Sequence, residues 1–191
     1  PTSSRRQRQM CIRDRLRGLD PAPGPEMKST GEVMGSHKNA AAAYLKARMA
    51  TEIPVPTHGG VYITVKDSDK ESIISLAKSL KDMEFDLYAT RGTAAVLRER
   101  GGLEVNSAYR IAEQGSPDAL DLMRDGKIQL IINTPTNSGG AVLDGNMMRR
   151  LAVELNIPFV TTMSGATMEV QAVAEMIKGL PEPRSLTIGT V

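Results

Sequence analysis

From Val61 onward, short aliphatic runs alternate with segments of helical periodicity, and this alternation constrains the fold more than any other feature. The runs have the length and β-branched character of buried strands, and the segments between them repeat apolar residues every three or four positions. We expect strands at Val61–Val65, Phe85–Ala89, Val105–Ile111, Ile128–Asn133, Ile157–Thr161 and Ser185–Ile188. We expect helices at Asp69–Met83, Thr93–Arg100, Asp118–Arg124, Asn146–Leu155 and Ala166–Lys178.

The alternation predicts the α/β class, with a Rossmann-like parallel sheet that carries helices on both faces. The sequence has two Phe, four Tyr and no Trp, so the core of this sheet must be aliphatic. Ligands of such sheets bind beyond the carboxyl ends of the strands. Polar residues at those ends are therefore the first candidates for a binding site.

The first 17 residues differ in charge from the rest of the chain. They contain six Arg and one Asp, a local net charge of +5, whereas the remaining residues carry −3. Such a segment is typical of a nucleic-acid-binding arm, of a targeting segment, or of translated adapter sequence at the end of a sequencing fragment. It has no apolar stretch and no clear amphipathic period, which argues against targeting. We interpret residues 1–15 as a non-native tail.

Residues 16–56 have the character of a short irregular and helical extension. Three prolines between residues 21 and 25 exclude a regular element there. The Ala-rich segment Asn39–Met49 predicts a helix. Two prolines and two glycines between Thr51 and Gly60 mark a linker or boundary, and we place the main domain at residues 57–191.

The overall composition indicates a soluble globular protein, with 40% hydrophobic and 24% charged residues. No apolar run approaches the roughly 20 residues that a membrane span needs. Cys11 is the single cysteine, which excludes an internal disulfide and favours a reducing compartment. We expect a cytoplasmic protein that contacts no membrane.

The segment Ala89-Thr90-Arg91-Gly92-Thr93 joins a predicted strand to a predicted helix. Backbone N–H groups and hydroxyls converge at such a junction, where the helix dipole is positive, and can hold an anion such as phosphate. A Thr-Gly-Thr turn is also an ordinary helix N-cap. Both interpretations stay open on this segment alone.

Further polar residues fall at other predicted strand ends, and each alone also fits a loop, a cap or a turn. Jointly they offer two cations, several hydroxyls and a carboxamide, which is the donor set that a phosphomonoester needs. The predicted binding residues are Lys70, Thr90, Gly92, Thr93, Arg110, Asn133 and Thr134, with Thr161 further along. No histidine follows His58, and neither a metal-spaced Cys/His cluster nor a nucleophile–base pair is apparent, so no catalytic or metal-binding residue is predicted.

Several motifs together resemble the large chain of carbamoyl-phosphate synthase. The run Pro25-Glu-Met-Lys-Ser-Thr-Gly-Glu-Val-Met-Gly35 is similar to the end of its second ATP-grasp half. The chain from about Gly60 resembles its C-terminal allosteric domain, which has the methylglyoxal-synthase-like fold. The matching motifs in that domain are Asp69-Lys70, Ala89–Thr93, Ile131–Thr134, Arg149-Arg150 and Thr161-Thr162.

This resemblance implies that the residues predicted above bind a nucleotide monophosphate effector such as UMP or IMP. Arg110 stands where the family has a lysine, and Pro135 where some members have a threonine. Thr161 matches a residue of a second effector site, for ornithine, although Phe159 stands where some members have a tyrosine.

The resemblance also implies a parent enzyme, an ATP-dependent ligase that makes carbamoyl phosphate for the pyrimidine and arginine pathways. Its cofactors would be ATP and Mg²⁺ or Mn²⁺, with K⁺ as a further ion, and none of them would bind to this segment. Its partners would be the upstream synthetase domains of the same chain and a small glutaminase subunit. The segment alone is expected to be non-catalytic.

Two other function classes are less compatible with the sequence. A free-standing methylglyoxal-synthase-type lyase acting on dihydroxyacetone phosphate would need an aspartate base and a histidine, and no histidine lies in the predicted fold. A nucleic-acid-binding protein would depend on the Arg-rich tail, because the remainder is net acidic and poor in aromatic residues for stacking.

Overall fold

The computed structural model describes residues 33–51, 53–113, 115–135 and 139–181. These described residues all belong to one compact unit. The Arg-rich tail, most of the Pro25–Gly35 motif and the predicted strand at Ser185–Ile188 lie outside the described residues.

The centre of this unit is a five-stranded sheet in the order β3-β2-β1-β4-β5, with every neighbouring pair parallel. The predicted α/β fold with a parallel sheet is therefore confirmed. The strands are β1 (Gly60–Thr64), β2 (Asp86–Thr90), β3 (Asn106–Ala108), β4 (Ile128–Asn133) and β5 (Phe159–Val160).

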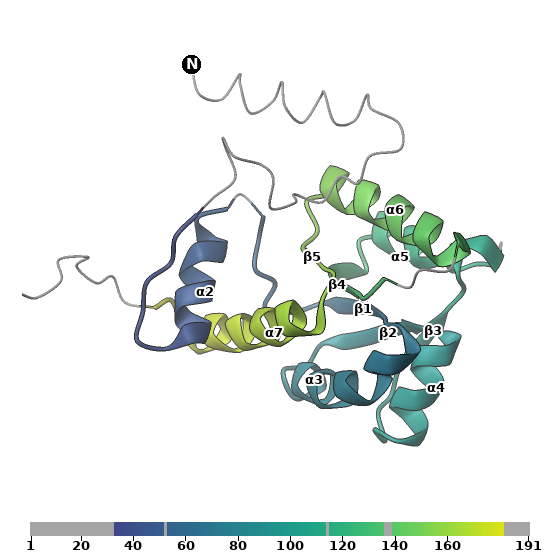
Figure 1. Ribbon diagram of the computed structural model, residues 1–191, viewed down its shortest axis with the longest axis horizontal. Coiled ribbons are helices and arrows are strands. Elements are labelled where there is room, and N and C mark those ends of the chain that lie inside the picture. The colour runs from purple at the N-terminus through teal and green to yellow at the C-terminus, as the bar shows by residue number, and fades with distance from the viewer. Residues whose placement is uncertain (1–32, 52, 114, 136–138, 182–191) are drawn as a thin grey trace, which may run out of the picture. The chain divides into compact units, whose positions relative to one another are not determined.

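Helices cover both faces of the sheet, with α5 and α6 on one face and α3, α4 and α7 on the other (Figure 1). The helices are α2 (Ala40–Met49), α3 (Lys70–Asp82), α4 (Arg91–Glu99), α5 (Ala119–Arg124), α6 (Gly139–Glu154) and α7 (Met163–Lys178). Short 3-10 turns occupy Asp67–Asp69 (η1) and Ile111–Glu113 (η2). Among the described residues, no helix combines the length and apolar character needed to cross a membrane.

The side chains of β1 alternate between two hydrophobic cores, as the two-residue period of a strand requires. Val61 and Ile63 are fully buried in a core formed with α3, α4 and α7. Tyr62 points to the other face and packs in a core formed with α5 and α6. The aromatic-poor composition is thus accommodated by two aliphatic cores, one on each face.

The predicted elements differ from the observed ones mainly at their ends. Strand β4 spans the predicted residues, whereas α6 begins at Gly139, seven residues before the predicted start. Gly139, Gly140 and Gly145 lower the helix propensity of that first part, so propensity alone placed the start too late. Strand β3 is shorter than predicted, because the chain enters η2 immediately after Arg110.

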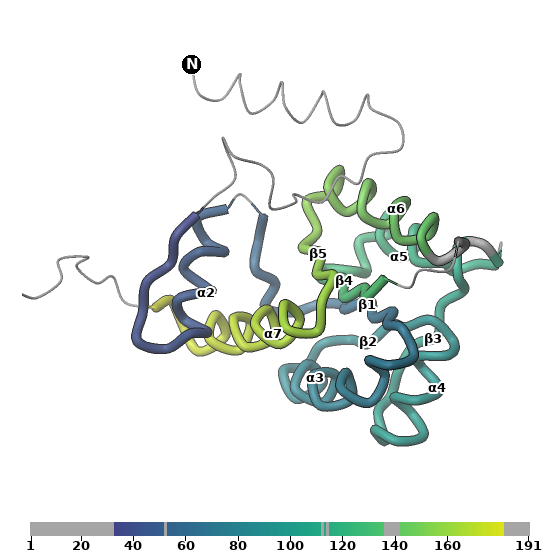
Figure 2. The backbone as a smooth tube through the Cα atoms, in the orientation of Figure 1, coloured from purple at the N-terminus to yellow at the C-terminus, as the bar shows by residue number. Residues whose placement is uncertain are grey.

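Helix α2 packs beside α7 (Figure 2). Glu169 of α7 is 1% exposed and accepts hydrogen bonds from the Arg48 guanidinium at 3.0–3.2 Å and from the Tyr44 hydroxyl at 2.9 Å. Arg48 also donates to Thr51 Oγ1 at 3.2 Å. These contacts attach the predicted extension helix to the sheet domain.

Candidate phosphate-binding site

A small pocket of about 50 Å³ opens beyond the carboxyl ends of β1 and β4. The chain leaves β1 toward β2 on one side and leaves β4 toward β5 on the other. This divergence is the topological switch point at which parallel sheets bind ligands. Thr64 of β1 and Asn133 of β4 are register partners at its base, and both line the pocket.

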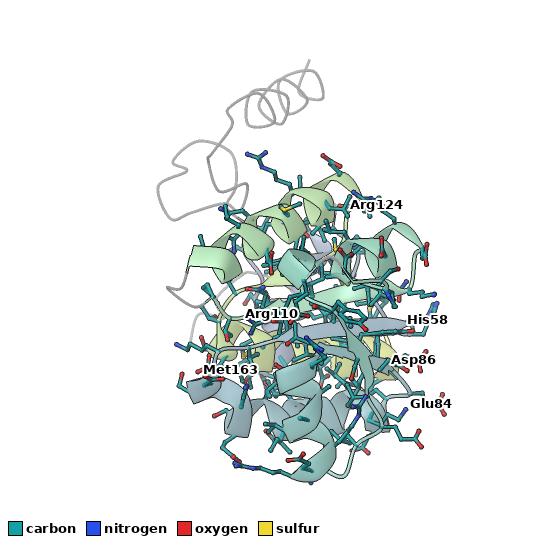
Figure 3. The ribbon with its side chains drawn as sticks, turned by 90° about the vertical axis from the view of Figure 1, so that its right-hand side faces the viewer. His58, Glu84, Asp86, Arg110, Arg124 and Met163 are labelled. Carbon is teal, nitrogen blue, oxygen red and sulfur yellow. The ribbon has the colours of Figure 1, made fainter. Side chains whose placement is uncertain are left out.

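Figure 3 separates the two ends of the sheet. Arg110, which follows β3, and Met163, which begins the helix after β5, lie on the side away from His58 and Asp86. His58 and Asp86 stand at the amino ends of β1 and β2. Thus Arg110 belongs to the ligand-binding end of the sheet, while His58 is at the opposite end.

Four of the predicted binding residues line this pocket: Thr90, Arg110, Asn133 and Thr134. Thr90, Asn133 and Thr134 are each at most 7% exposed, whereas Arg110 is exposed at the pocket mouth. Their grouping follows from the parallel order of the strands, which brings the ends of β2, β1 and β4 together. Whether they contact a ligand stays a prediction.

The Thr90–Thr93 turn does not act as a side-chain cap of α4. The Thr90 hydroxyl donates to Thr93 Oγ1 at 3.3 Å, and no side chain at the N-cap position accepts from the first turn of the helix. The two buried hydroxyls therefore bond to each other, while the first N–H groups of α4 keep the unsatisfied character of a helix N-terminus. The capping interpretation left open by the sequence is not the one observed.

Lys70 and Gly92 meet beside this turn. A Cβ built on Gly92 would lie 3.4 Å from Lys70 Nζ, so a side chain at Gly92 would crowd the ammonium group. Lys70 Nζ is 2.7 Å from Asp67 Oδ1, and this hydrogen-bonded contact lowers the pKa of the Asp67 carboxyl. Lys70 is thus near the α4 N-terminus, although it is not part of the pocket wall.

Arg91 links the loop after β2 to the loop after β3. Its guanidinium is 2.8 Å from Glu113 Oε1 and lies over the Tyr109 ring, 5.4 Å from the centroid. The second oxygen of Glu113 accepts from the Arg110 backbone N–H at 3.1 Å. The hydrogen bond from Arg91, followed by that from Arg110, lowers the pKa of the Glu113 carboxyl. The pair therefore holds the loop that carries Arg110.

Thr134 joins the ends of β1 and β4. Its N–H donates to Thr64 O at 3.1 Å, and its hydroxyl accepts from the Lys66 N–H at 3.0 Å. The neighbouring Asn133 is 5% exposed and lines the pocket, and its carboxamide atoms are not among the buried polar atoms that lack a partner in the described residues. Asn133 therefore presents its carboxamide to the pocket.

Sequence reasoning missed several residues of the pocket wall. Asp144 of α6 adds a carboxylate to the wall, and Tyr62 adds a phenol. Strand alternation would have found Tyr62, because it lies two residues before Thr64 and shares its face. Asp144 lies in the glycine-rich part of α6 that was not predicted as helix, so no signal placed it there. The apolar residues of this wall are Val65, Ile111, Ala119, Pro135 and Met148.

Thr161 is separate from the other predicted residues. It follows β5 and does not line the pocket. Its neighbour Thr162 caps α7 by accepting the Gly165 N–H at 3.1 Å. The described residues contain no group of three or more His, Cys, Asp or Glu side chains that could hold a metal ion.

Residues 72–161 match the family of MGS-like domains. The chain is 47% identical over 161 residues to the carbamoyl phosphate synthase large chain, C-terminal section, of Methanopyrus kandleri, which covers 84% of this chain and 29% of that protein. It is 45% identical over 165 residues to the same section from Methanocaldococcus jannaschii, covering 86% of this chain and 26% of that protein.

The carbamoyl phosphate synthase large chain of Methanothermobacter thermautotrophicus is 41% identical over 172 residues, covering 90% of this chain and 16% of that protein. The chain thus spans less than a third of the length of these relatives. A crystal structure of methylglyoxal synthase from Elizabethkingia anophelis superposes with a TM-score of 0.48 at 16% identity, covering 61% of this chain and 79% of that one. The chain contains an MGS-like domain and is similar, over most of its length, to the C-terminal section of the carbamoyl phosphate synthase large chain.

Proposed function

We propose that this chain is the regulatory segment of the large subunit of a glutamine-hydrolysing carbamoyl-phosphate synthase, and that its pocket binds a nucleoside monophosphate of the UMP or IMP type. The observation that carries the proposal is the pocket wall, where the Asn133 carboxamide lies together with the Thr90 and Thr134 hydroxyls and the Arg110 guanidinium. The similarity to the C-terminal section of the synthase supports the same assignment.

The phosphate would bind between the α4 N-terminus and the Arg110 side chain. The first N–H groups of α4 and the Thr93 hydroxyl supply neutral donors, since the Thr90 hydroxyl already donates to Thr93 Oγ1, and the helix dipole favours an anion at this position. Arg110 supplies a guanidinium that can bond two phosphate oxygens at once. Lys70, next to Gly92, adds a second cation at the edge of the same turn.

The nucleoside would occupy the remainder of the pocket. Asn133 offers both donor and acceptor groups, and the Asp144 carboxylate can accept from a hydroxyl. Ile111, Ala119 and Met148 provide an apolar surface for a flat ring. A phosphate-binding end joined to an apolar end fits a nucleotide better than inorganic phosphate.

Binding would regulate the parent enzyme by changing how this domain packs on the synthetase domains. An effector shifts such an equilibrium only by the difference in its affinity for the two packings, typically about 1–3 kcal/mol. The parent would use ATP with Mg²⁺ or Mn²⁺, and K⁺, at upstream sites, receive ammonia from the small glutaminase subunit, and supply the pyrimidine and arginine pathways. Thr161 would belong to a second effector site for ornithine, and this segment alone would not turn over.

Isothermal calorimetry on the 191-residue chain tests the proposal. We expect UMP or IMP to bind, and Thr93→Val to weaken binding by roughly tenfold, because the variant removes a hydroxyl from the phosphate turn while keeping its shape. Thr167→Val is the matched control, because Thr167 bonds to Met163 O on α7 at 3.0 Å and lies outside the pocket wall. This control should bind like the unaltered chain.

Dihydroxyacetone phosphate is the second probe, because the pocket wall also carries one acid, Asp144. Formation of methylglyoxal from this triose phosphate would overturn the regulatory assignment in favour of a lyase. Failure of both nucleotides to bind would overturn it as well.

A further inference from the structure

Tyr62 contributes a neutral hydroxyl to the wall of the pocket. Its side chain is 2% exposed, lines the pocket, and packs in the same core as Ala119 and Met148. The hydroxyl is not among the buried polar atoms that lack a partner in the described residues. A phenol joins an apolar ring to a polar tip, so this group is placed to bond to a molecule in the pocket.

The phenol keeps its proton at neutral pH. Burial raises the pKa of Tyr62 above its ordinary value, and the nearby carboxylates of Asp144 and Asp118 raise it further. A neutral phenol can donate a hydrogen bond. Because carboxylate oxygens are acceptors only, Tyr62 is the complementary donor on this side of the pocket.

The position of Tyr62 decides which part of a nucleotide it meets. Thr90 ends β2 and Arg110 follows β3, and these two residues would hold the phosphate. Tyr62 lies two residues before the end of β1 and packs in the same core as the apolar residues Ala119 and Met148. A flat heterocycle is the part of a nucleotide that an apolar wall accepts. The phenol therefore faces the ring rather than the phosphate.

We propose that Tyr62 is a specificity-determining residue that donates a hydrogen bond to a ring carbonyl oxygen of the bound base. The inference rests on the proposed nucleotide site and adds a preference within it. Uracil and hypoxanthine have a carbonyl at the ring position where cytosine and adenine have an amino group. The carbonyl oxygen accepts the hydrogen bond from the phenol. The amino group is itself a donor, so it leaves the phenol without an acceptor.

Tyr62→Phe in the full 191-residue chain is the direct test, measured by calorimetry with UMP, CMP and ribose 5-phosphate. We expect the variant to bind UMP roughly three- to tenfold more weakly, as the loss of one neutral hydrogen bond predicts. The ratio of UMP to CMP affinity should fall toward one. The affinity for ribose 5-phosphate, which has no base, should stay unchanged.

Tyr88→Phe is the matched control. Tyr88 is the register partner of Tyr62 on β2 and packs against the same core, but it does not line the pocket. It should leave all three affinities unchanged, and thermal unfolding of both variants reports whether the core is intact.

The outcomes separate this inference from the proposed function. An unchanged UMP to CMP ratio in Tyr62→Phe, or an equal loss for ribose 5-phosphate, would overturn the role of Tyr62 while nucleotide binding stands. If the unaltered chain binds neither ribose 5-phosphate nor any nucleotide, both proposals are wrong.

Discussion

Two regions of this domain bury polar side chains, and the surroundings of these side chains differ between the two regions. Between α2 and α7, the Glu169 carboxylate is bonded on both oxygens by Arg48 and also receives the Tyr44 hydroxyl. At the carboxyl end of the sheet, Asn133 and Tyr62 are also buried, but both line a pocket. The Glu169 side chain is bonded within the chain, whereas Asn133 and Tyr62 face a space that we propose a ligand fills.

The difference shows what each region is for. A buried charge is tolerated only when its partners are present. The cluster of Glu169, Arg48 and Tyr44 therefore stabilises the fold, and removing one partner should destabilise the protein. A polar group that bonds to a ligand contributes little to the free energy of unfolding of the ligand-free protein. Its removal weakens ligand binding instead. The same substitution logic therefore predicts opposite outcomes in the two regions.

The largest expected effect is on stability, from Glu169→Ala. The substitution leaves the Arg48 guanidinium, 12% exposed, without its carboxylate and should lower the free energy of unfolding by about 3–5 kcal/mol. Urea denaturation monitored by circular dichroism measures this loss. Nucleotide affinity, measured under conditions where the variant is folded, should not change.

Glu175→Gln on the same helix is the control for that prediction. Glu175 pairs with Lys178 at 3.0 Å on the surface, where such a pair contributes less than about 1 kcal/mol. If Glu169→Ala and Glu175→Gln destabilise the protein equally, the α2–α7 cluster is not the structural contact that we describe.

The pocket should show the reverse pattern in Asn133→Leu. The change removes a carboxamide that lines the pocket, so the free energy of unfolding should stay within about 1 kcal/mol of its original value. Nucleotide affinity should fall by roughly tenfold or more, because the bonds that Asn133 makes to the ligand are lost. Denaturation and calorimetry on the same preparation measure both quantities.

Gln129→Leu provides the matched carboxamide on the same strand. Gln129 accepts from the Gly60 N–H and donates to Gly126 O, both at 2.6 Å. Its loss should cost about 1–3 kcal/mol of stability and leave nucleotide affinity unchanged, because the side chain is outside the pocket wall. A stability loss in Asn133→Leu as large as that in Gln129→Leu would contradict the contrast between the two groups.

The fold was largely predictable from the sequence because its signals are local. Strand β4 is aliphatic except for Gln129 and the terminal Asn133, and its predicted bounds are the observed ones. The parallel order then brings Thr90, Asn133 and Thr134 into one pocket, since residues at carboxyl ends of neighbouring parallel strands must be close. Strand alternation and the rules for strand connections are therefore sufficient to predict this part of the pocket.

The remainder depends on packing between elements far apart in the sequence. Asp144 reaches the pocket because α6 lies beside the end of β4; a Cβ on Gly145 would be 3.9 Å from the Asn133 carboxamide, an ordinary van der Waals distance. The pairing of Arg48 with Glu169 joins residues 121 positions apart. Helix propensity and hydrophobic periodicity describe neighbouring residues only. They therefore could not predict these contacts between distant parts of the sequence.

The smallest expected effect is a pH dependence of the α2–α7 cluster. Burial, and next the Glu169 carboxylate, raises the pKa of Tyr44 to about 12, from 10.0 in the unfolded chain. Between these values the unfolded state loses the phenol proton while the folded state keeps it, so stability is complete below pH 10 and falls as the pH rises toward 12. Because Tyr44 is only half-buried, the loss should be about 1 kcal/mol after solvent screening. Urea denaturation at pH 9 and pH 11 should show a steeper decline for the unaltered chain than for Tyr44→Phe, and parallel declines would mean that Glu169 does not hold the phenol in its neutral form.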